Sequence, residues 1–161
     1  MRLMYKKAVL LSATALALAS VSPAFAQSDP PRFAQTLPDQ VTWVQTGALL
    51  PGGQSAVIYG EPQKAGFYVT RTKLPADFKV LPHTHPDERV YTVISGTFTI
   101  GFGEKFDPAR LKSFAPGSVF VVPANTSHFH WARSGETVVQ ISGLAPTAIE
   151  YTDHADDPRK K

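Results

Sequence analysis

Hydrophobic and polar residues alternate in short runs along most of the chain. Val90-Tyr91-Thr92-Val93-Ile94 is the clearest run, and its β-branched and aromatic residues are typical of a β-strand. Turn residues follow such runs about every 8–12 positions, which predicts an all-β antiparallel sandwich or barrel. Only 107–112 is predicted to be helical, with Asp107 as N-cap and Pro108 in the first position. The predicted strands are 41–44, 55–59, 66–74, 78–81, 90–94, 97–102, 119–122, 128–132 and 137–143.

The first residues have the pattern of a secretory signal peptide. Arg2, Lys6 and Lys7 precede an apolar run over 8–21, and Ala24-Phe25-Ala26 matches a signal-peptidase site. We therefore expect cleavage after Ala26 and a periplasmic or secreted protein. The alternative is an uncleaved membrane anchor, but the run is shorter than the roughly 20 residues that span a bilayer. The mature protein is thus expected not to span a membrane.

Four segments are expected along the chain. They are a signal peptide (1–26), a flexible leader with the first strands (27–59), a barrel (60–146) and a polar C-terminal tail (147–161) whose charged end is predicted to be loose. The length of 161 residues is typical of one domain.

Composition excludes several kinds of chemistry. The sequence has no cysteine, so disulfides, thiolate metal ligands and a thiol nucleophile are ruled out. The net charge is +3, and the basic residues are scattered along the chain. No nucleic-acid partner is therefore expected.

Two histidine pairs are the candidate chemistry. His83 and His85 are two residues apart, as are His128 and His130. Residues with this spacing on a strand face the same side, so each pair can present two imidazoles to one point. The alternatives are surface histidines at the start of a hairpin, or core histidines with satisfied hydrogen bonds. Two pairs in one chain favour metal binding.

These motifs resemble those of the cupin superfamily. His83-Thr84-His85 with Gly96 is similar to the first cupin motif, and Gly117-x5-Pro123-x4-His128 is similar to the second; the resemblance extends over about 60–143. It is strongest to small exported bacterial single-domain cupins of the type-2, RmlC-like kind. The resemblance implies a small jelly-roll barrel with one divalent transition metal (Fe, Mn, Zn, Cu or Ni) held by His83, His85 and His128.

One position departs from the family pattern. Arg89 stands where cupins normally have a glutamate ligand, and Glu88 is one residue too early. Glu88 could bind the metal only if a bulge turned it inward, because a shift of one residue on a strand reverses the side chain. An inward Arg89 could instead bind an anionic substrate through its guanidinium. The alternative for Arg89 is an outward side chain or an ion pair with Glu88 or Asp87.

The resemblance allows two kinds of function. Three-histidine iron cupins include dioxygenases, so a metal-dependent oxidoreductase acting on a small organic molecule is the first expectation. A non-catalytic protein that binds a small molecule or a metal is the second, since a fold does not fix a function. His130 and Tyr91 are the candidates for proton transfer, although a tyrosine at such a position is more often core packing. Cupins often pair, so a homodimer is also suggested.

Overall fold

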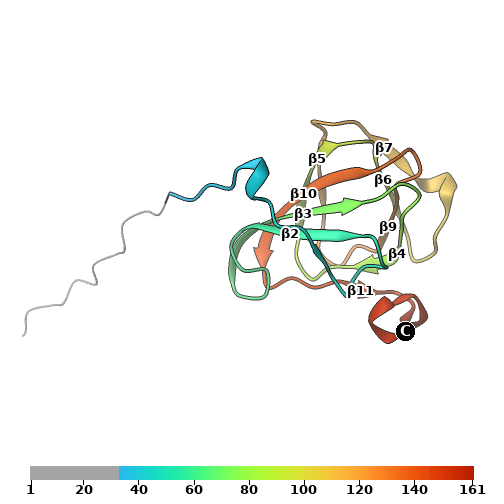
Figure 1. Ribbon diagram of the computed structural model, residues 1–161. Helices are drawn as coiled ribbons and strands as arrows, with labels where there is room; N and C mark the ends of the chain where they lie inside the picture. Colours follow the sequence, from blue (N-terminus) through green and yellow to red (C-terminus); the bar gives the residue numbers. More distant parts are fainter. Residues whose placement is uncertain (1–32) are drawn as a thin grey trace, which may run out of the picture. The chain divides into compact units, whose positions relative to one another are not determined.

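The predicted all-β barrel is confirmed. The computed structural model describes residues 33–161. Two antiparallel sheets face each other, and the helices in these residues are all short 3-10 turns (Figure 1). The first sheet has the strand order β1-β2-β3-β10-β5-β8, and the second has the order β11-β4-β9-β6-β7. The strands are β1 (Val44–Gln45), β2 (Gln54–Tyr59), β3 (Gly66–Leu74), β4 (Lys79–Thr84), β5 (Arg89–Ser95), β6 (Phe98–Phe102), β7 (Lys112–Phe114), β8 (Val119–Val122), β9 (His128–Trp131), β10 (Thr137–Ala145) and β11 (Glu150–Tyr151).

The core lies between the two sheets and follows the period of two seen in the sequence. On β5, Arg89, Tyr91 and Val93 are buried, whereas Val90 and Ile94 are exposed. Apolar side chains from both sheets meet in the interior, which favours folding by removing them from water. The main members of this core are Tyr68, Leu74, Phe78, Val80, Tyr91, Val93, Phe98, Ile100, Val122, Val139 and Ile141.

The predicted helical segment is a single turn. A 3-10 helix covers Pro108–Arg110, and the Asp107 carboxylate accepts a hydrogen bond from the Ala109 amide at 2.9 Å. The N-cap assigned from the sequence is therefore confirmed. Within residues 33–161 no helix is long and apolar enough to cross a membrane.

The two motif glycines both adopt positive φ angles but differ in their surroundings. A Cβ on Gly96 would lie 2.2 Å from the Glu136 carbonyl oxygen, whereas a Cβ on Gly117 would meet no atom within 4 Å. We expect Gly117→Ala to lower the free energy of unfolding by about 1–2 kcal/mol, the cost of a left-handed backbone. Gly96→Ala should cost about 1–3 kcal/mol more, because it also forces two backbones apart. Urea denaturation checks both, and equal losses would contradict the assigned clash.

The C-terminal segment, predicted to be a polar tail, adds a strand to the second sheet. Glu150 and Tyr151 form β11, which pairs with Thr84 and His83 on β4, and the Tyr151 hydroxyl donates to the Ala48 carbonyl at 2.9 Å. The physical reason is the edge of β4, whose backbone groups need a partner. The composition of this segment shows its charge, but it does not show that the segment pairs with the edge of β4.

The last residues are also folded back. Two 3-10 turns cover His154–Asp156 and Pro158–Lys160. The Arg159 guanidinium donates to Asp157 at 2.8 Å and to the Ile149 carbonyl at 3.0 Å. These bonds hold the charged end of the chain close to β11.

The predicted signal peptide and its cleavage after Ala26 lie outside the described residues. From residue 34 onward the leader contacts the barrel. A 3-10 turn covers Pro38–Gln40, β1 pairs with β2, and the Thr36 hydroxyl donates to the Ile58 carbonyl at 3.0 Å. The described part of the leader is therefore fixed to the first sheet.

Candidate metal centre

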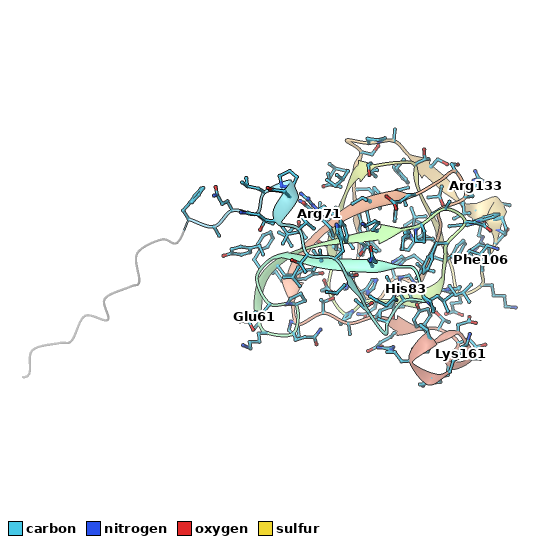
Figure 2. The ribbon with its side chains drawn as sticks, in the orientation of Figure 1. Glu61, Arg71, His83, Phe106, Arg133 and Lys161 are labelled. Atoms are coloured by element: carbon cyan, nitrogen blue, oxygen red, sulfur yellow. The ribbon has the colours of Figure 1, made fainter. Side chains whose placement is uncertain are left out.

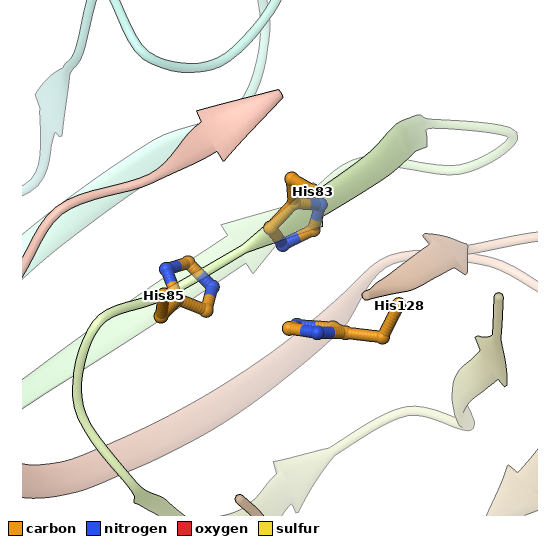
Figure 3. A group of neighbouring side chains, drawn as sticks. All are labelled: His83, His85 and His128. Carbon is orange, nitrogen blue, oxygen red and sulfur yellow. The ribbon is translucent and has the colours of Figure 1, made fainter. Parts of the chain in front are cut away.

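Three of the predicted ligands converge on one point inside the barrel. His83 lies on β4 and pairs directly with His128 at the start of β9, while His85 follows one residue after β4. One ring nitrogen from each histidine lies within 4.8 Å of the others, and the rings face a common centre (Figure 3). Nitrogens on one ion at about 2.0–2.1 Å also lie within this limit of one another, so the spacing is compatible with a shared ion.

Backbone carbonyls fix the orientation of all three rings. Nδ1 of His83 faces the Leu81 carbonyl at 2.7 Å, Nδ1 of His85 faces that of Ala148 at 2.5 Å, and Nδ1 of His128 faces that of Thr126 at 2.8 Å. A carbonyl only accepts, so each neutral imidazole has its proton on Nδ1 and its lone pair on Nε2. This arrangement is the usual support of a histidine that binds a metal.

The free nitrogens fit a metal ion. Nε2 of His128 is fully buried and has no hydrogen-bond partner. A buried acceptor without a partner is rare and requires an explanation. His83, which is labelled in Figure 2, is also buried. A divalent transition metal that accepts three imidazole lone pairs would satisfy these atoms, and Fe, Zn, Cu and Ni favour such ligands.

The three histidines are held in the form that binds metal. Burial lowers the pKa of His83, which the nearby His128 and Arg89 lower further. The pKa of His85 is lowered by burial and by the charge of Arg89. Burial lowers the pKa of His128 to about 4. All three are therefore neutral near pH 7, and no proton has to leave before an ion binds.

The same shifts predict how the stability of the metal-free protein depends on pH. The folded-state pKa of His128 is about 4, whereas an unfolded histidine titrates near about 6.5. The unfolded state therefore binds more protons below this value, and the free energy of unfolding should fall as the pH decreases from about 6.5 towards 4. Urea denaturation in a chelator at about pH 7.5, 6 and 5 measures this, and at these values most ordinary carboxylates are still ionised. The His128→Gln variant should show a weaker dependence, and equal stability of the wild type at all three values would contradict the prediction.

His130 and Tyr91 lie beside this group but outside it. The His130 ring is buried, with ring centroids 5.4 Å from His83 and 5.1 Å from His128, and its Nδ1 has no hydrogen-bond partner. Tyr91 comes from the opposite sheet, where its ring stacks on Phe120 at 5.2 Å and lies 6.3 Å from His130. Both line the cavity described below, and their roles in proton transfer stay predictions.

Glu88 and Arg89 point in opposite directions. The Glu88 side chain is exposed and does not belong to the histidine group. Arg89 is only 7% exposed. It is the first residue of β5 that pairs with β8, and its partner there is Val122. The β5–β8 pairing shows no bulge at this point, so nothing turns Glu88 inward. The structure therefore brings the arginine and not the glutamate to the wall that faces the histidines.

Arg89 belongs to a buried polar network that the sequence did not predict in full. Asp87 is buried, and its carboxylate accepts from the Tyr68 hydroxyl at 2.5 Å and from Arg89 Nε at 3.3 Å. The Thr147 hydroxyl also bonds to both Asp87 and Arg89. An ion pair with Asp87 was one alternative for Arg89. The one signal for it is the spacing of two residues, which places Asp87 and Arg89 on the same side of the chain.

Gly143 makes room for this network. It lies opposite Arg89 on β10, and a Cβ there would be 2.8 Å from Asp87 Oδ2 and 2.9 Å from the Tyr68 hydroxyl. A glycine is therefore needed at position 143, because the Asp87 carboxylate and the Tyr68 hydroxyl lie where any side chain would begin.

A cavity of about 180 Å³ opens beside the histidines. Polar groups on its wall include His83, His85, His130 and Arg89. Much of the rest is apolar and comes from the core, including Leu49, Leu74, Val80, Phe98, Val139 and Ile141. A small, mostly apolar molecule could thus lie next to an ion held by the three histidines.

The chain belongs to the cupin family. The family described as Cupin matches residues 61–157, which include the four buried histidines, Tyr91 and the polar network around Arg89. No curated protein matches the sequence. The resemblance stated from the two motifs is confirmed, and the match continues into the segment that was expected to be a tail.

Solved structures share the fold at low sequence identity. The polyketide cyclase RemF from Streptomyces resistomycificus is 14% identical with a TM-score of 0.65, over 80% of this chain and 92% of that one. An RmlC-like cupin from Shewanella frigidimarina is 15% identical with a TM-score of 0.53, over 71% and 93%. The DMSP lyase DddQ from Ruegeria pomeroyi is 15% identical with a TM-score of 0.56, over 71% and 64%. Likeness at this level shows the fold alone.

Proposed function

We propose that this protein is an exported, metal-dependent oxidoreductase of the dioxygenase type that acts on a small organic molecule. The observation that supports the proposal is the group of three neutral histidines, each with Nδ1 against a carbonyl, beside a cavity large enough for a small substrate. His83, His85 and His128 would hold the ion, and the remaining positions on it would be left for oxygen and substrate. The ion would supply Lewis acidity or electrons for oxygen chemistry.

The residues around the ion have complementary tasks. Burial raises the pKa of Tyr91, so its phenol keeps the proton and can donate it. Burial and the neighbouring histidines lower the pKa of His130, which is therefore neutral and offers an unpartnered Nδ1. The apolar core residues of the cavity exclude water from the reacting groups. In this proposal Tyr91 and His130 hold and transfer protons, and neither binds the ion.

Two neighbours favour a second candidate. RemF is named a polyketide cyclase and DddQ a DMSP lyase, and neither name describes an oxidation. A metal held by three neutral histidines keeps its full positive charge and is a strong Lewis acid. Non-oxidative, metal-dependent chemistry is therefore the alternative reaction class for this cavity. A protein that only binds its ligand is the third outcome to be tested.

Metal substitution separates these functions. Protein purified from the exporting host is analysed for its elements, and the metal-free form is then loaded with Fe, Mn, Cu, Ni or Zn. Each form is given a panel of small carboxylates and phenols while oxygen consumption and product formation are followed. Oxygen uptake with a redox-active ion but not with Zn supports the dioxygenase. Turnover with Zn and without oxygen supports the Lewis-acid enzyme, and thermal stabilisation without any turnover supports a binding protein.

His130 should influence turnover but not metal content. We expect His130→Gln to keep the metal stoichiometry of the wild type while lowering kcat, with a loss of about 10²-fold or more typical of a missing proton-transfer group. The conservative variant Tyr91→Phe provides the matched test of the donor on the opposite wall. Loss of the metal from His130→Gln would contradict the assignment and make His130 a ligand.

Export and oligomeric state are part of the same proposal. Export is supported by the basic start, the apolar run and Ala24-Phe25-Ala26. The intact mass of the exported protein should equal that of a chain starting at Gln27. A mass equal to that of the chain with Met1 and the apolar run would contradict cleavage. The suggested homodimer stays a prediction, which light scattering coupled to gel filtration tests.

A further inference from the structure

We infer that the ligand of this cavity is a small monocarboxylate with an apolar body, and that Arg89 Nη1 binds its carboxylate. The inference rests on the proposed function in that it places the ligand in the same cavity. It goes further by naming the chemical class of the ligand and the atom that recognises it. Three observations support it: the charge on the cavity wall, the state of the arginine donors and the character of the remaining wall.

Arg89 provides the charge. Among the described residues that line the cavity, it is the only side chain with a formal charge near pH 7, because the histidines there are neutral. Asp87, its partner, does not line the cavity and lies behind the guanidinium. Asp87 compensates part of this charge, but only the guanidinium reaches the cavity, so a ligand meets N–H donors and no acceptor of formal charge on the wall, which favours an anion and disfavours an amine.

The arginine is held with one nitrogen unused. Nε and Nη2 donate to Asp87, and Nη2 also donates to Thr147 and to the Ala148 carbonyl. The Tyr91 hydroxyl also lies within reach of the guanidinium, and apart from that contact Nη1 makes no hydrogen bond within residues 33–161. In the described residues the fully buried side-chain nitrogen and oxygen atoms that have no partner are His128 Nε2 and His130 Nδ1. Arg89 Nη1 is not one of them, so it is not fully buried. Nη1 therefore borders accessible space, and two N–H groups are available to a carboxylate oxygen.

The remaining wall limits the ligand to one anionic group. Apart from Arg89 and the histidines, it presents core side chains such as Leu74, Phe98 and Ile141. The wall also includes the uncharged hydroxyl residues Thr46, Ser55, Thr70, Thr72, Tyr91 and Thr147. Away from the place where an ion would be held, a second carboxylate would find no second cation and would lose its hydration. The wall fits an aliphatic or aromatic body instead, in a space of about 180 Å³.

The position of Arg89 gives the ligand its direction. Arg89 lies on β5 in the first sheet, whereas His83 and His128 lie on β4 and β9 in the second sheet. The guanidinium nevertheless lies next to His85, because Arg89 Nη2 and His85 Nδ1 contact the same Ala148 carbonyl at 3.4 Å and 2.5 Å. A carboxylate bound to Nη1 is thus held beside the place where an ion would be bound, and the apolar body of the ligand can extend over the core side chains of the cavity. A lysine could not replace this arginine, because three donors on one flexible nitrogen cannot satisfy Asp87 and a ligand in the same fixed geometry.

Binding to the metal-free protein tests the inference without any turnover. Calorimetry in a chelator compares benzoate with benzamide, its neutral isostere, and with benzylamine. We expect benzoate to bind about 10-fold or more tightly than benzamide, since a charge-assisted hydrogen bond is lost in the amide. Benzylamine should not bind. Equal affinities of benzoate and benzamide would overturn the inference.

Variants assign the effect to one side chain. Arg89→Met should abolish the preference for benzoate, and Arg89→Lys should reduce it. The control is Arg71→Met, because Arg71 lies on β3 outside the cavity and donates to Gln140 at 3.1 Å. Arg71→Met should bind benzoate as the wild type does. A preference that survives in Arg89→Met, or that appears only after metal is added and does not need Arg89, overturns the inference.

A crystallographic measurement covers the case in which Arg89→Met does not fold. Metal-free wild-type crystals soaked in 4-bromobenzoate should show the carboxylate at Nη1 and the bromine, by anomalous scattering, among the apolar side chains. A bromine elsewhere, or none, overturns the inference. If benzoate binds through Arg89 but no metal form consumes oxygen, the ligand class stands and the dioxygenase proposal fails. If a metal form consumes oxygen but benzoate does not bind through Arg89, the dioxygenase proposal stands and the proposed ligand class fails.

Discussion

A His128→Ala variant is expected to lose affinity for divalent transition metals by about 100-fold or more. Loss of a supporting partner of a ligand already costs about 10–100-fold, and loss of a ligand itself should cost at least the upper end of that range. His128 is fully buried, and its Nε2 is a buried ligand atom without a hydrogen-bond partner. Competition with a chromogenic chelator measures the affinity, and elemental analysis measures the occupancy.

The chain contains a matched control for this experiment. His154 is an exposed histidine near the C-terminus whose Nδ1 contacts Lys160 Nζ at 2.7 Å, and it lies outside the histidine group. His154→Ala should bind metal as the wild type does. Circular dichroism establishes that His128→Ala is folded. A folded His128→Ala protein with full metal occupancy would show that the ion is not bound by the three histidines.

Replacing Asp87 with alanine is expected to lower the free energy of unfolding by about 3–5 kcal/mol. That is the usual cost of removing one partner of a buried ion pair, because the remaining charge stays buried without compensation. The side chains of Arg89 and Asp87 are only 8% and 5% exposed. Tyr68 and Thr147 also lose the acceptor of their hydroxyl groups in this variant. Urea denaturation of the metal-free protein measures the loss.

Two further variants identify the cause of that loss. Glu88→Ala changes the neighbouring carboxylate, which is exposed, and should alter stability by less than about 0.5 kcal/mol. The double variant Asp87→Leu, Arg89→Met removes both charges and should recover a large part of the lost stability, since apolar pairs often replace buried ion pairs well. If the double variant is less stable than Asp87→Ala, the uncompensated charge is not the main cause.

The strands and the histidine group could be predicted because both depend on local spacing. The alternation in β5 places Tyr91 and Val93 inside, and the same period of two aligns His83 with His85. Pairing of β4 with β9 then brings His128 opposite His83. The two motifs and their family resemblance supplied this long-range step, which local periodicity does not contain.

The polar network could not be predicted in the same way, because its members are far apart in the sequence. Asp87 bonds to Tyr68, 19 residues earlier, and to Thr147, 60 residues later. Neither residue has a pattern that distinguishes it from an ordinary strand or turn residue. The inward direction of Arg89 did follow from alternation, whereas its occupied donors depend on chain segments that only the folded barrel brings together.

The carbonyl of Ala148 has a consequence for shortened chains. It accepts from Nδ1 of His85, a residue 63 positions earlier, and β11 next to it covers the edge of β4. A premature stop codon just before residue 147 would leave every histidine of the group in the protein. It would nevertheless remove the acceptor that sets the tautomer of His85 and the hydroxyl that contacts Arg89. Gene boundaries and expression fragments that end at the last long strand would therefore yield a barrel with a complete set of ligands and a poorly aligned site.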